Sequence, residues 1–333
     1  MNKLLTIVVP VYKVEPYINK CLDSCVLADE KLMSQLEVII VNDGTPDRSA
    51  EMSREYVKRY PQTFRQIDKE NGGHGSAWNV GLKEATGKYL RFLDSDDWLT
   101  NLDKLMEKLA ETDADLVFTQ MVMYHATDDY YEKEIIVDSV EVCKRFEDFD
   151  FSSNSYDHLL DFWHTTYKTS ILHFGTNLFK EHTMYDDGIL FVLPAIKGKT
   201  YILYDFVLYN YFIGREGQSL GQEKKPKNIR ARYQQCKYMW NFWITHRENM
   251  APKIDFEIRS IIARFAHCLF NDFYLLPYKE CKAYSEQCSE YIESVVLPHY
   301  SKVYRRYKKI PTYLWFIVEK FRNSQFYHRI LNI

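Results

Sequence analysis

Three short apolar runs near the start of the chain constrain its fold more than any other feature of the sequence. They cover residues 4–11, 37–41 and 88–93, are rich in aliphatic and aromatic residues, and each is followed by polar residues. Runs of this length and composition are typical of strands buried on both faces, as in a parallel sheet. The sequence therefore predicts the core of an α/β fold here.

Segments with helical periodicity separate these runs. Residues 16–27 and 76–85 carry apolar side chains at helical spacing, and residues 47–60 predict a helix capped by Asp47 or Ser49. Alternating strands and helices indicate a doubly wound, Rossmann-like sheet. Ligands of such sheets bind beyond the carboxyl ends of the strands. We therefore expect one rim to gather the polar groups that close the three runs: Tyr12 with Lys13, Asn42 to Gly44, and Asp94 to Asp97.

The rest of the chain predicts a second, different domain. Residues 102–110 are expected to form a helix, 115–123 a strand, and 189–196 and 201–211 further core segments. From residue 214 glycines and a charged run at 223–226 indicate a linker, and long helical patterns follow at 229–246 and 256–275. We predict a catalytic domain over 1–215 and a mostly helical C-terminal domain over 216–333.

Charge and cysteine content exclude several classes of protein. A formal net charge of −3 argues against binding nucleic acid as the main role, because that affinity depends on neutralising phosphates. The seven scattered cysteines contain no C-x-x-C pair, which favours neither disulfides nor zinc and fits a reducing cytoplasm. We expect the run at 4–11 to be a strand rather than a signal peptide, since Pro10 and Lys13 interrupt it. No apolar stretch reaches the ~18 residues of a spanning helix.

The acidic cluster Asp94, Asp96 and Asp97 is the strongest chemical signal. Three carboxylates within four residues repel one another unless a cation, a basic partner or water compensates them. In an extended D-x-D segment the outer side chains point the same way and address one ion, and oxygen ligands suit Mg²⁺ or Mn²⁺. The alternative is a helix N-cap by Ser95 or Asp96, with the helix beginning near Trp98.

Five segments in order make the sequence resemble the family 2 glycosyltransferases of the GT-A fold. They are IVVPVY (7–12), VIIVNDGTPD (38–47), ENGGHGSAWNVGL (70–82), ATGKYL (85–90) and LDSDDWL (93–99). The resemblance runs from about residue 6 to 219. It implies a GT-A nucleotide-binding domain and a non-processive, bacterial-type enzyme. Such an enzyme transfers a sugar, with inversion, from a nucleotide-diphosphate donor such as a UDP-sugar.

The resemblance also implies a donor site. By position, Pro10 and Tyr12 would line the nucleobase pocket, and Asp43 would hydrogen-bond the base, typically uracil. Chemistry agrees, because an aromatic ring offers a stacking face and a carboxylate accepts from a ring N–H. Without the resemblance, Tyr12 would be a plain strand-end aromatic and Asp43 a turn residue before Gly44.

A glycine-bearing loop beside the nucleotide is the next implied part of the donor site. Asn71, Gly73 and Asn79 match it, and missing side chains there let backbone approach a ligand. Trp78 departs from the pattern, since many members carry Arg at this position. That departure argues against this loop supplying a cation to the diphosphate.

Metal and catalytic residues follow from the same resemblance. Asp96 is implied as the direct ligand of Mn²⁺ or Mg²⁺, with Asp94 beside the ribose or the metal and Asp97 as a third member. An inverting transfer also needs a general base. Asp187 matches the second residue of the family's later acidic pair, and Asp186, which replaces Glu, is the second choice. Without the resemblance, this pair would be interpreted as a helix N-cap.

Further basic and aromatic residues are candidates for contacts with donor and acceptor. The resemblance implies a cation over the diphosphate, for which Arg215 is the candidate, with His173 and His182 as alternatives. Residues 163–168 resemble the acceptor side, where aromatic faces stack on sugar rings or simply form core. The acceptor is expected to be a hydroxyl of a glycan or a lipid-linked molecule.

The basic, aromatic tail after His299 leaves two interpretations open. Eight Lys and Arg residues there face one acid, Glu319, around the apolar block 313–318. This pattern fits either peripheral contact with an anionic membrane at the cytoplasmic face, or a packed helix buried in a homo-oligomer.

The function that the sequence favours is that of a glycosyltransferase of cell-surface polysaccharide synthesis. A catalytically idle sugar-nucleotide-binding scaffold and, less so, a nucleotidyltransferase are the alternatives.

Overall fold

The computed structural model divides the chain into two compact units, Met1–Gln218 and Ser219–Ile333. It describes residues 3–125, 130–133, 140–149, 161–175, 177–215, 218, 225–270 and 272–291. The domain boundary predicted from the sequence, after residue 215, lies three residues before the end of the first unit. The assignment of the second unit as a separate helical domain stays a prediction.

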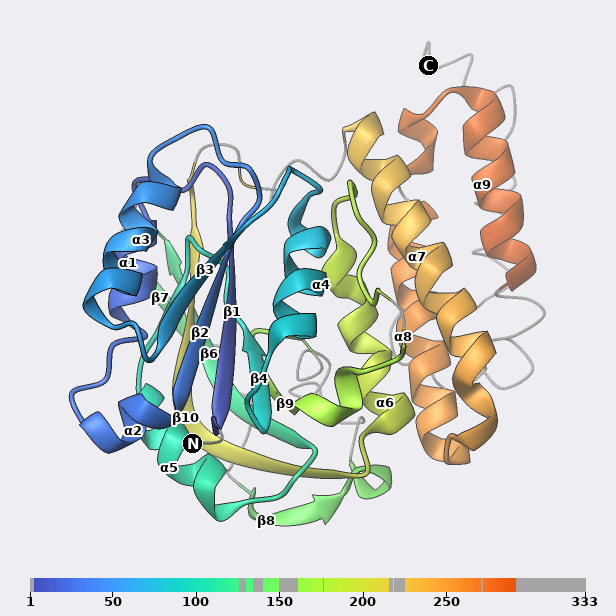
Figure 1. The fold of residues 1–333 in the computed structure, drawn as a ribbon. Helices are drawn as coiled ribbons and strands as arrows, with labels where there is room; N and C mark the ends of the chain where they lie inside the picture. Colours follow the sequence, from blue (N-terminus) through green and yellow to red (C-terminus); the bar gives the residue numbers. More distant parts are fainter. Residues whose placement is uncertain are drawn as a thin grey trace. The chain divides into compact units, whose positions relative to one another are not determined.

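A ten-stranded mixed sheet forms the first unit, in the order β3-β2-β1-β4-β9-β6-β10-β5. Four parallel strands make its N-terminal half: β1 (Leu5–Val11), β2 (Leu36–Asn42), β3 (Phe64–Asp68) and β4 (Tyr89–Phe92) (Figure 1). Every residue of β1, β2 and β4 is buried, as their apolar composition predicts.

The other half of the sheet is built by later strands. β6 (Leu116–His125) and the long β10 (Thr200–Ile213) run parallel, and β9 (Thr165–Lys168) lies antiparallel between β4 and β6. The short β5 (Trp98–Leu99) pairs with β10, so the segment after Asp97 is a strand and not the helix of the capping alternative. β7 (Tyr130–Lys133) extends β6, and β8 (Val140–Arg145) extends β10.

Helices cover both faces of the parallel strands (Figure 1). α1 (Ile18–Asp23) and α3 (Ser49–Arg59) lie on one face, and α4 (His74–Glu84) lies on the other. α4 approaches β1 closely, because a Cβ on Gly81 would stand 2.1 Å from Val8 Cγ1. The remaining helices of this unit are α2 (Glu30–Gln35), α5 (Leu102–Glu111), α6 (Leu193–Lys197) and the 3₁₀ turns η1 (Phe146–Asp148), η2 (Thr169–Leu172) and η3 (Asp186–Phe191).

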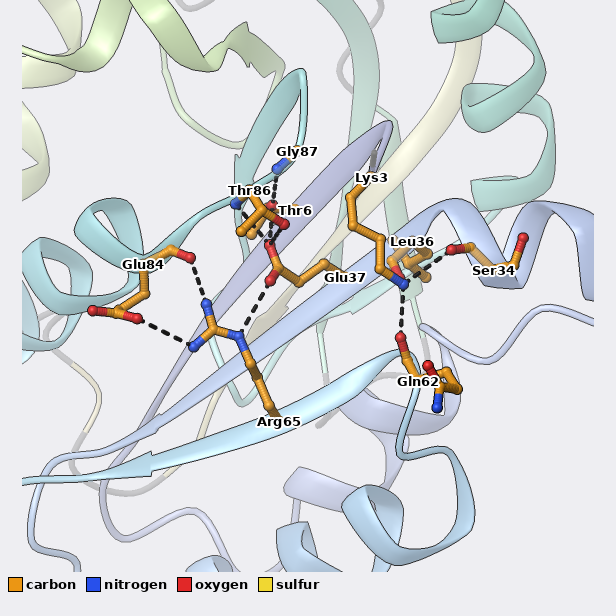
Figure 2. A network of polar contacts seen from close by, with 10 residues as sticks. All are labelled: Lys3, Thr6, Ser34, Leu36, Glu37, Gln62, Arg65, Glu84, Thr86 and Gly87. Atoms are coloured by element: carbon orange, nitrogen blue, oxygen red, sulfur yellow. Dashed lines mark hydrogen bonds and ion pairs between the residues drawn. The ribbon is translucent and has the colours of Figure 1, made fainter. Parts of the chain in front are cut away.

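A polar network around Glu37 joins the amino-terminal ends of the strands (Figure 2). The buried Glu37 carboxylate accepts hydrogen bonds from the Thr6 hydroxyl (2.6 Å) and from the backbone N–H of Thr86 (2.9 Å), and Arg65 pairs with it at 3.2 Å. Burial alone would raise the pKa of Glu37, but these hydrogen bonds lower it below its usual range. The network thus fixes β1, β2, β3 and the α4–β4 connection at the end opposite the predicted rim.

The described part of the second unit is helical. Its helices are α7 (Pro226–His246), α8 (Pro252–Phe270) and α9 (Tyr278–Tyr291), with the 3₁₀ turns η4 (Arg247–Asn249) and η5 (Phe273–Leu275). Tyr233 of α7 stacks on Tyr284 of α9 at 4.0 Å between ring centroids, and Trp243 donates a hydrogen bond to Asp255 at 2.9 Å. The basic tail after His299 lies outside the described residues.

Candidate active site

The carboxyl ends of β1, β2 and β4 form a common rim. The parallel register pairs Val11 with Asn42 and Val8 with Phe92. The backbone N–H of Asp43 donates to the carbonyl of Val11 at 3.0 Å, and that of Leu93 donates to Val8 at 3.0 Å. The polar segments that follow these three strands therefore leave the sheet at one edge, as expected from the sequence.

Tyr12 presents an open face at this rim. Its side chain is 43% exposed, while Pro10 in β1 is buried. The Lys13 ammonium lies 5.3 Å from the centre of the Tyr12 ring, and Lys13 itself has a φ of 56°. An exposed aromatic ring at the end of a buried strand suits stacking by a flat ligand.

Asp43 organises the glycine-bearing loop. Its buried carboxylate accepts hydrogen bonds from the backbone N–H groups of Gly72 (2.9 Å) and Gly73 (2.8 Å), from the Asn71 amide (3.1 Å) and from the Lys69 ammonium (2.6 Å). Two oxygens with four donors make Asp43 the anchor of this loop. Its contact with a nucleobase remains a prediction.

Asn79 fastens α4 to a distant segment. Its side-chain amide donates to the carbonyl of Phe179 at 2.8 Å and accepts from the Phe179 backbone N–H at 2.9 Å. Both ends of the amide are thus occupied by protein, and the side chain is buried. The structure gives Asn79 a role in holding residues 179–183 against the loop, and its contact with a ligand stays a prediction.

Asp94, Asp96 and Asp97 lie together at the end of β4. One carboxylate oxygen from each falls within 4.8 Å of the others, a spacing that fits shared coordination of one ion. Asp97 is the most buried of the three. Burial, with the charges of Asp96 and Asp94 added, raises the pKa of Asp97 well above its usual range.

Asp97 is bound to β10 through both oxygens. It accepts hydrogen bonds from the Tyr209 hydroxyl at 2.6 Å and from the Phe212 backbone N–H at 2.8 Å. The Tyr209 hydroxyl also accepts from the backbone N–H of Asp94 at 3.2 Å. Asp97 and Tyr209 therefore fix the acidic segment to the sheet, and Asp94 and Asp96 are the better-placed ligands.

Arg215 pairs with Asp96 in this structure. The guanidinium donates to Asp96, and a pocket of about 210 Å³ adjoins this carboxylate. The pocket is lined by Pro16, Tyr17, Lys20, Asp96, Trp98 and Phe212. Arg215 thus lies at the acidic cluster, and its predicted contact with the diphosphate remains a prediction. An ion bound by Asp96 would have to share this carboxylate with Arg215 or displace it.

His74, which the sequence analysis did not select, joins two acidic segments. Its Nε2 lies 3.0 Å from an oxygen of Asp94, and its Nδ1 lies 3.1 Å from an oxygen of Asp186. Burial alone would lower the pKa of His74, but the charges of Asp186 and Asp94 raise it well above its usual range. The loop therefore supplies a titratable ring to two carboxylates, although Trp78 stands where many family members carry Arg.

Asp187 lies in an environment that raises the pKa of its carboxyl. Asp186 is buried, whereas Asp187 next to it is half-buried at the start of η3. Burial, with the charge of Asp186 added, raises the pKa of Asp187 to about 7. Asp94 and His74 lie near enough to act on this carboxyl electrostatically. The structure thus brings the acidic pair to the Asp94 cluster.

The residues suggested for acceptor contacts, and the two histidines suggested as alternatives to Arg215 over the diphosphate, differ in burial. His164 and Tyr167 are fully buried, so they belong to the core around β9 rather than to a stacking surface. Trp163 is half-buried, and its ring lies 5.1 Å from that of Tyr211 on β10. His173 and His182 are exposed, and no ion pair of either is found with the acidic cluster among the described residues.

Comparison with known proteins shows which family of proteins this chain resembles in sequence. Residues 6–175, about half of the chain, match the family model Glycosyl transferase family 2. The glycosyltransferase GlyA of Streptococcus pneumoniae is 32% identical over 218 residues, which are 62% of this chain and 29% of GlyA. The uncharacterized glycosyltransferase EpsJ of Bacillus subtilis is 42% identical over 119 residues, 35% of this chain and 33% of EpsJ. The matched regions thus span about a third or less of these relatives.

A solved structure shows the same fold. TarS 1–349 of S. aureus in complex with UDP superposes with a TM-score of 0.64 at 18% identity, over 88% of this chain and 81% of that one. The fold is the α/β fold of GT-A glycosyltransferases, as the sequence predicted. Within that class, the chain belongs to glycosyl transferase family 2.

A further observation concerns the length and apolar character of the helices. Among the helices that the structure describes, none is both long and apolar enough to span a bilayer.

Proposed function

We propose that this chain is an inverting glycosyltransferase that moves a sugar from a UDP-sugar to a hydroxyl of a glycan or lipid-linked acceptor. The observation that carries the proposal is the meeting of Asp94 and Asp186 at His74, with ring nitrogens 3.0 and 3.1 Å from the two carboxylates. These residues come from distant parts of the chain. Their meeting sets Asp187 beside the acidic cluster on the rim that carries Tyr12.

The donor would lie along this rim. Tyr12 offers its open face to the base, and Asp43 holds the loop of residues 71–73 so that backbone lines the nucleotide. Support for uridine comes from the related fold of TarS, which was solved with UDP. Arg215, already at Asp96, is suited to meet the negative charge of the diphosphate.

Asp187 would act as the base. The acceptor oxygen attacks C1 of the sugar, the bond from C1 to the diphosphate oxygen breaks, and Asp187 accepts the hydroxyl proton. A carboxyl pKa of about 7 suits this step, because such a base is both ionised and able to hold a proton near neutral pH. Asp186 is less suited, since it is buried against His74.

Asp96 and Asp94 would hold a divalent ion, Mn²⁺ or Mg²⁺. Their half-buried oxygen donors fit a hard cation, while both oxygens of Asp97 are engaged with β10. Such an ion neutralises charge that develops on the departing diphosphate. We further propose that the chain acts in cell-surface polysaccharide synthesis at the cytoplasmic face of the membrane.

Two substitutions test the assignment. Asp96→Ala should abolish metal-dependent turnover, and Asp187→Asn should lower transfer by about 100-fold or more, in the range that general bases contribute, while UDP still binds. The measurement is UDP release from a panel of nucleotide sugars with Mn²⁺, together with calorimetric titration of UDP. Asp103→Asn on the exposed face of α5 serves as the matched loss of a carboxylate.

The outcomes separate the proposed functions. If Asp187→Asn turns over at the parental rate, the base is assigned to the wrong residue. If the parent chain binds UDP but releases none from any donor, with glycan or lipid-linked acceptors supplied, the idle scaffold is the better description.

A further inference from the structure

His74 stands at a point where three elements converge. Gly73, with a φ of 87°, turns the loop into α4, and His74 is the first residue of that helix. The next residue must be small, because a Cβ on Gly75 would lie 2.6 Å from an Asp186 oxygen and 2.5 Å from the Lys180 carbonyl. The local sequence therefore lets the acidic segment approach the His74 ring.

Both nitrogens of His74 face carboxylates. Nε2 is 3.0 Å from Asp94 and Nδ1 is 3.1 Å from Asp186. Both ring nitrogens of His74 are thus engaged by oxygens of the protein, one from each acidic segment. No ring N–H is then left for a phosphate or a sugar, which excludes His74 as a direct hydrogen-bond donor to the substrate in this arrangement.

The ring of His74 packs at a tilt against a cluster of aromatic side chains. It lies 4.1 Å from the ring of Trp78, one turn further along α4. Trp78 is fully buried, and packs against Phe92 at 4.4 Å and Phe179 at 5.0 Å. Phe92 belongs to β4, two residues before Asp94, so the support of the ring and its carboxylate partner share one strand.

Resting on the proposed function, we propose that His74 is a positioning residue that fixes the donor-side carboxylate Asp94 and the base-side carboxylate Asp186 relative to each other. Without His74, this ring would no longer join Asp186, which is 2% exposed, to Asp94. The contact of His74 with Asp94 governs donor binding. Its contact with Asp186 governs the orientation of Asp187 toward the acceptor.

The test compares His74→Gln with His74→Arg. Gln retains polarity but has no charge and one donor group, whereas Arg offers a planar cation with donors on several edges. We expect His74→Gln to lower kcat about 30-fold, about 2 kcal/mol, and UDP affinity in Mn²⁺ about fivefold, about 1 kcal/mol. His74→Arg should recover most of both. Lys83→Gln, which removes a charge from the exposed end of α4, should match the parent.

A double-mutant cycle separates positioning from general stability. His74→Gln and Asp186→Asn should be strongly non-additive in kcat, because each removes the same bridge. Melting temperatures of all variants are measured in parallel. The inference is overturned if folded His74→Gln stays within twofold of the parent in kcat and UDP affinity. Folded His74→Arg performing no better than Gln would overturn it too. If the parent itself transfers no sugar, the proposed function fails. The measured UDP affinities of the parent and the His74 variants still decide the role of His74 at Asp94.

Discussion

At the scale of single residues, Asp187 has the most distinctive chemistry in the site. Its carboxyl pKa of about 7, raised by burial and by Asp186, predicts that kcat/KM rises with pH and levels off above about 7. The base must be ionised to accept a proton, so activity falls on the acid side. Asp187→Asn should remove this pH dependence, and a profile of the parent that is flat from pH 5.5 to 8.5 would contradict the assignment.

The same shift has a consequence for stability with the opposite pH trend. A carboxyl whose pKa is raised by folding stabilises the native state most below its unfolded pKa, and that contribution is lost as the pH rises through about 7. We expect Asp187→Asn to be more stable than the parent by up to about 4 kcal/mol at pH 8, with the difference shrinking at pH 5. Urea unfolding at the two pH values measures this, and a larger difference at pH 5 would contradict it.

Residue by residue, the sequence predicted those parts of the site that lie next to a strand end. Asp94, Asp96, Asp43 and Tyr12 could be found because each follows a buried run. His74 could not, since its partners are 20 and 112 residues away and only the fold brings them together. The one available signal was a titratable side chain inside the glycine loop.

At the scale of elements, the predicted strands are those buried on both faces. β1, β2 and β4 follow continuous apolar runs, and the structure places them within two residues of the expected bounds. β3, with the sequence FRQID, lies at the end of the sheet and is mostly half-buried, so polar residues hide it. β9, with the sequence TTYK, is fixed by pairing with β4 and β6, which no local pattern reveals.

The packing of α4 on β1 gives a prediction at this scale. A Cβ on Gly81 would lie 2.1 Å from Cγ1 and 2.9 Å from Cγ2 of Val8, so Gly81→Ala should force α4 away from the sheet. We expect a loss of about 1–3 kcal/mol in the free energy of unfolding, as overpacking usually costs. Val8→Ala removes both clashing methyl groups, so the double variant should lose less than the sum of the single variants. Additive losses in urea unfolding would show that the helix is not held by this contact.

At the scale of the whole molecule, the two compact units have different sequence signatures and different expected responses to ligand. The first unit carries every residue of the proposed donor site, from Tyr12 to Arg215. The described part of the second unit is a helical bundle whose polar pairs, such as Arg230 with Glu280 and Arg232 with Asp272, are internal to it. A nucleotide should therefore stabilise only the first unit.

Thermal unfolding with UDP and Mn²⁺ tests that division. A ligand at 100 times its Kd stabilises the state that binds it by about 2.7 kcal/mol. For a unit of about 200 residues, this corresponds to a rise in Tm of about 5–10 °C. We expect a transition assigned to the first unit to move by this amount.

EDTA or Asp96→Ala should reduce the shift, because the ion joins the diphosphate to the acidic cluster. A second transition, if resolved by calorimetry, should stay where it is, since a metal and nucleotide bound only at the rim of the sheet add nothing to helices α7, α8 and α9. Equal shifts of both transitions would contradict the division, because they would mean that ligand binding and the unfolding of the helical unit are energetically coupled.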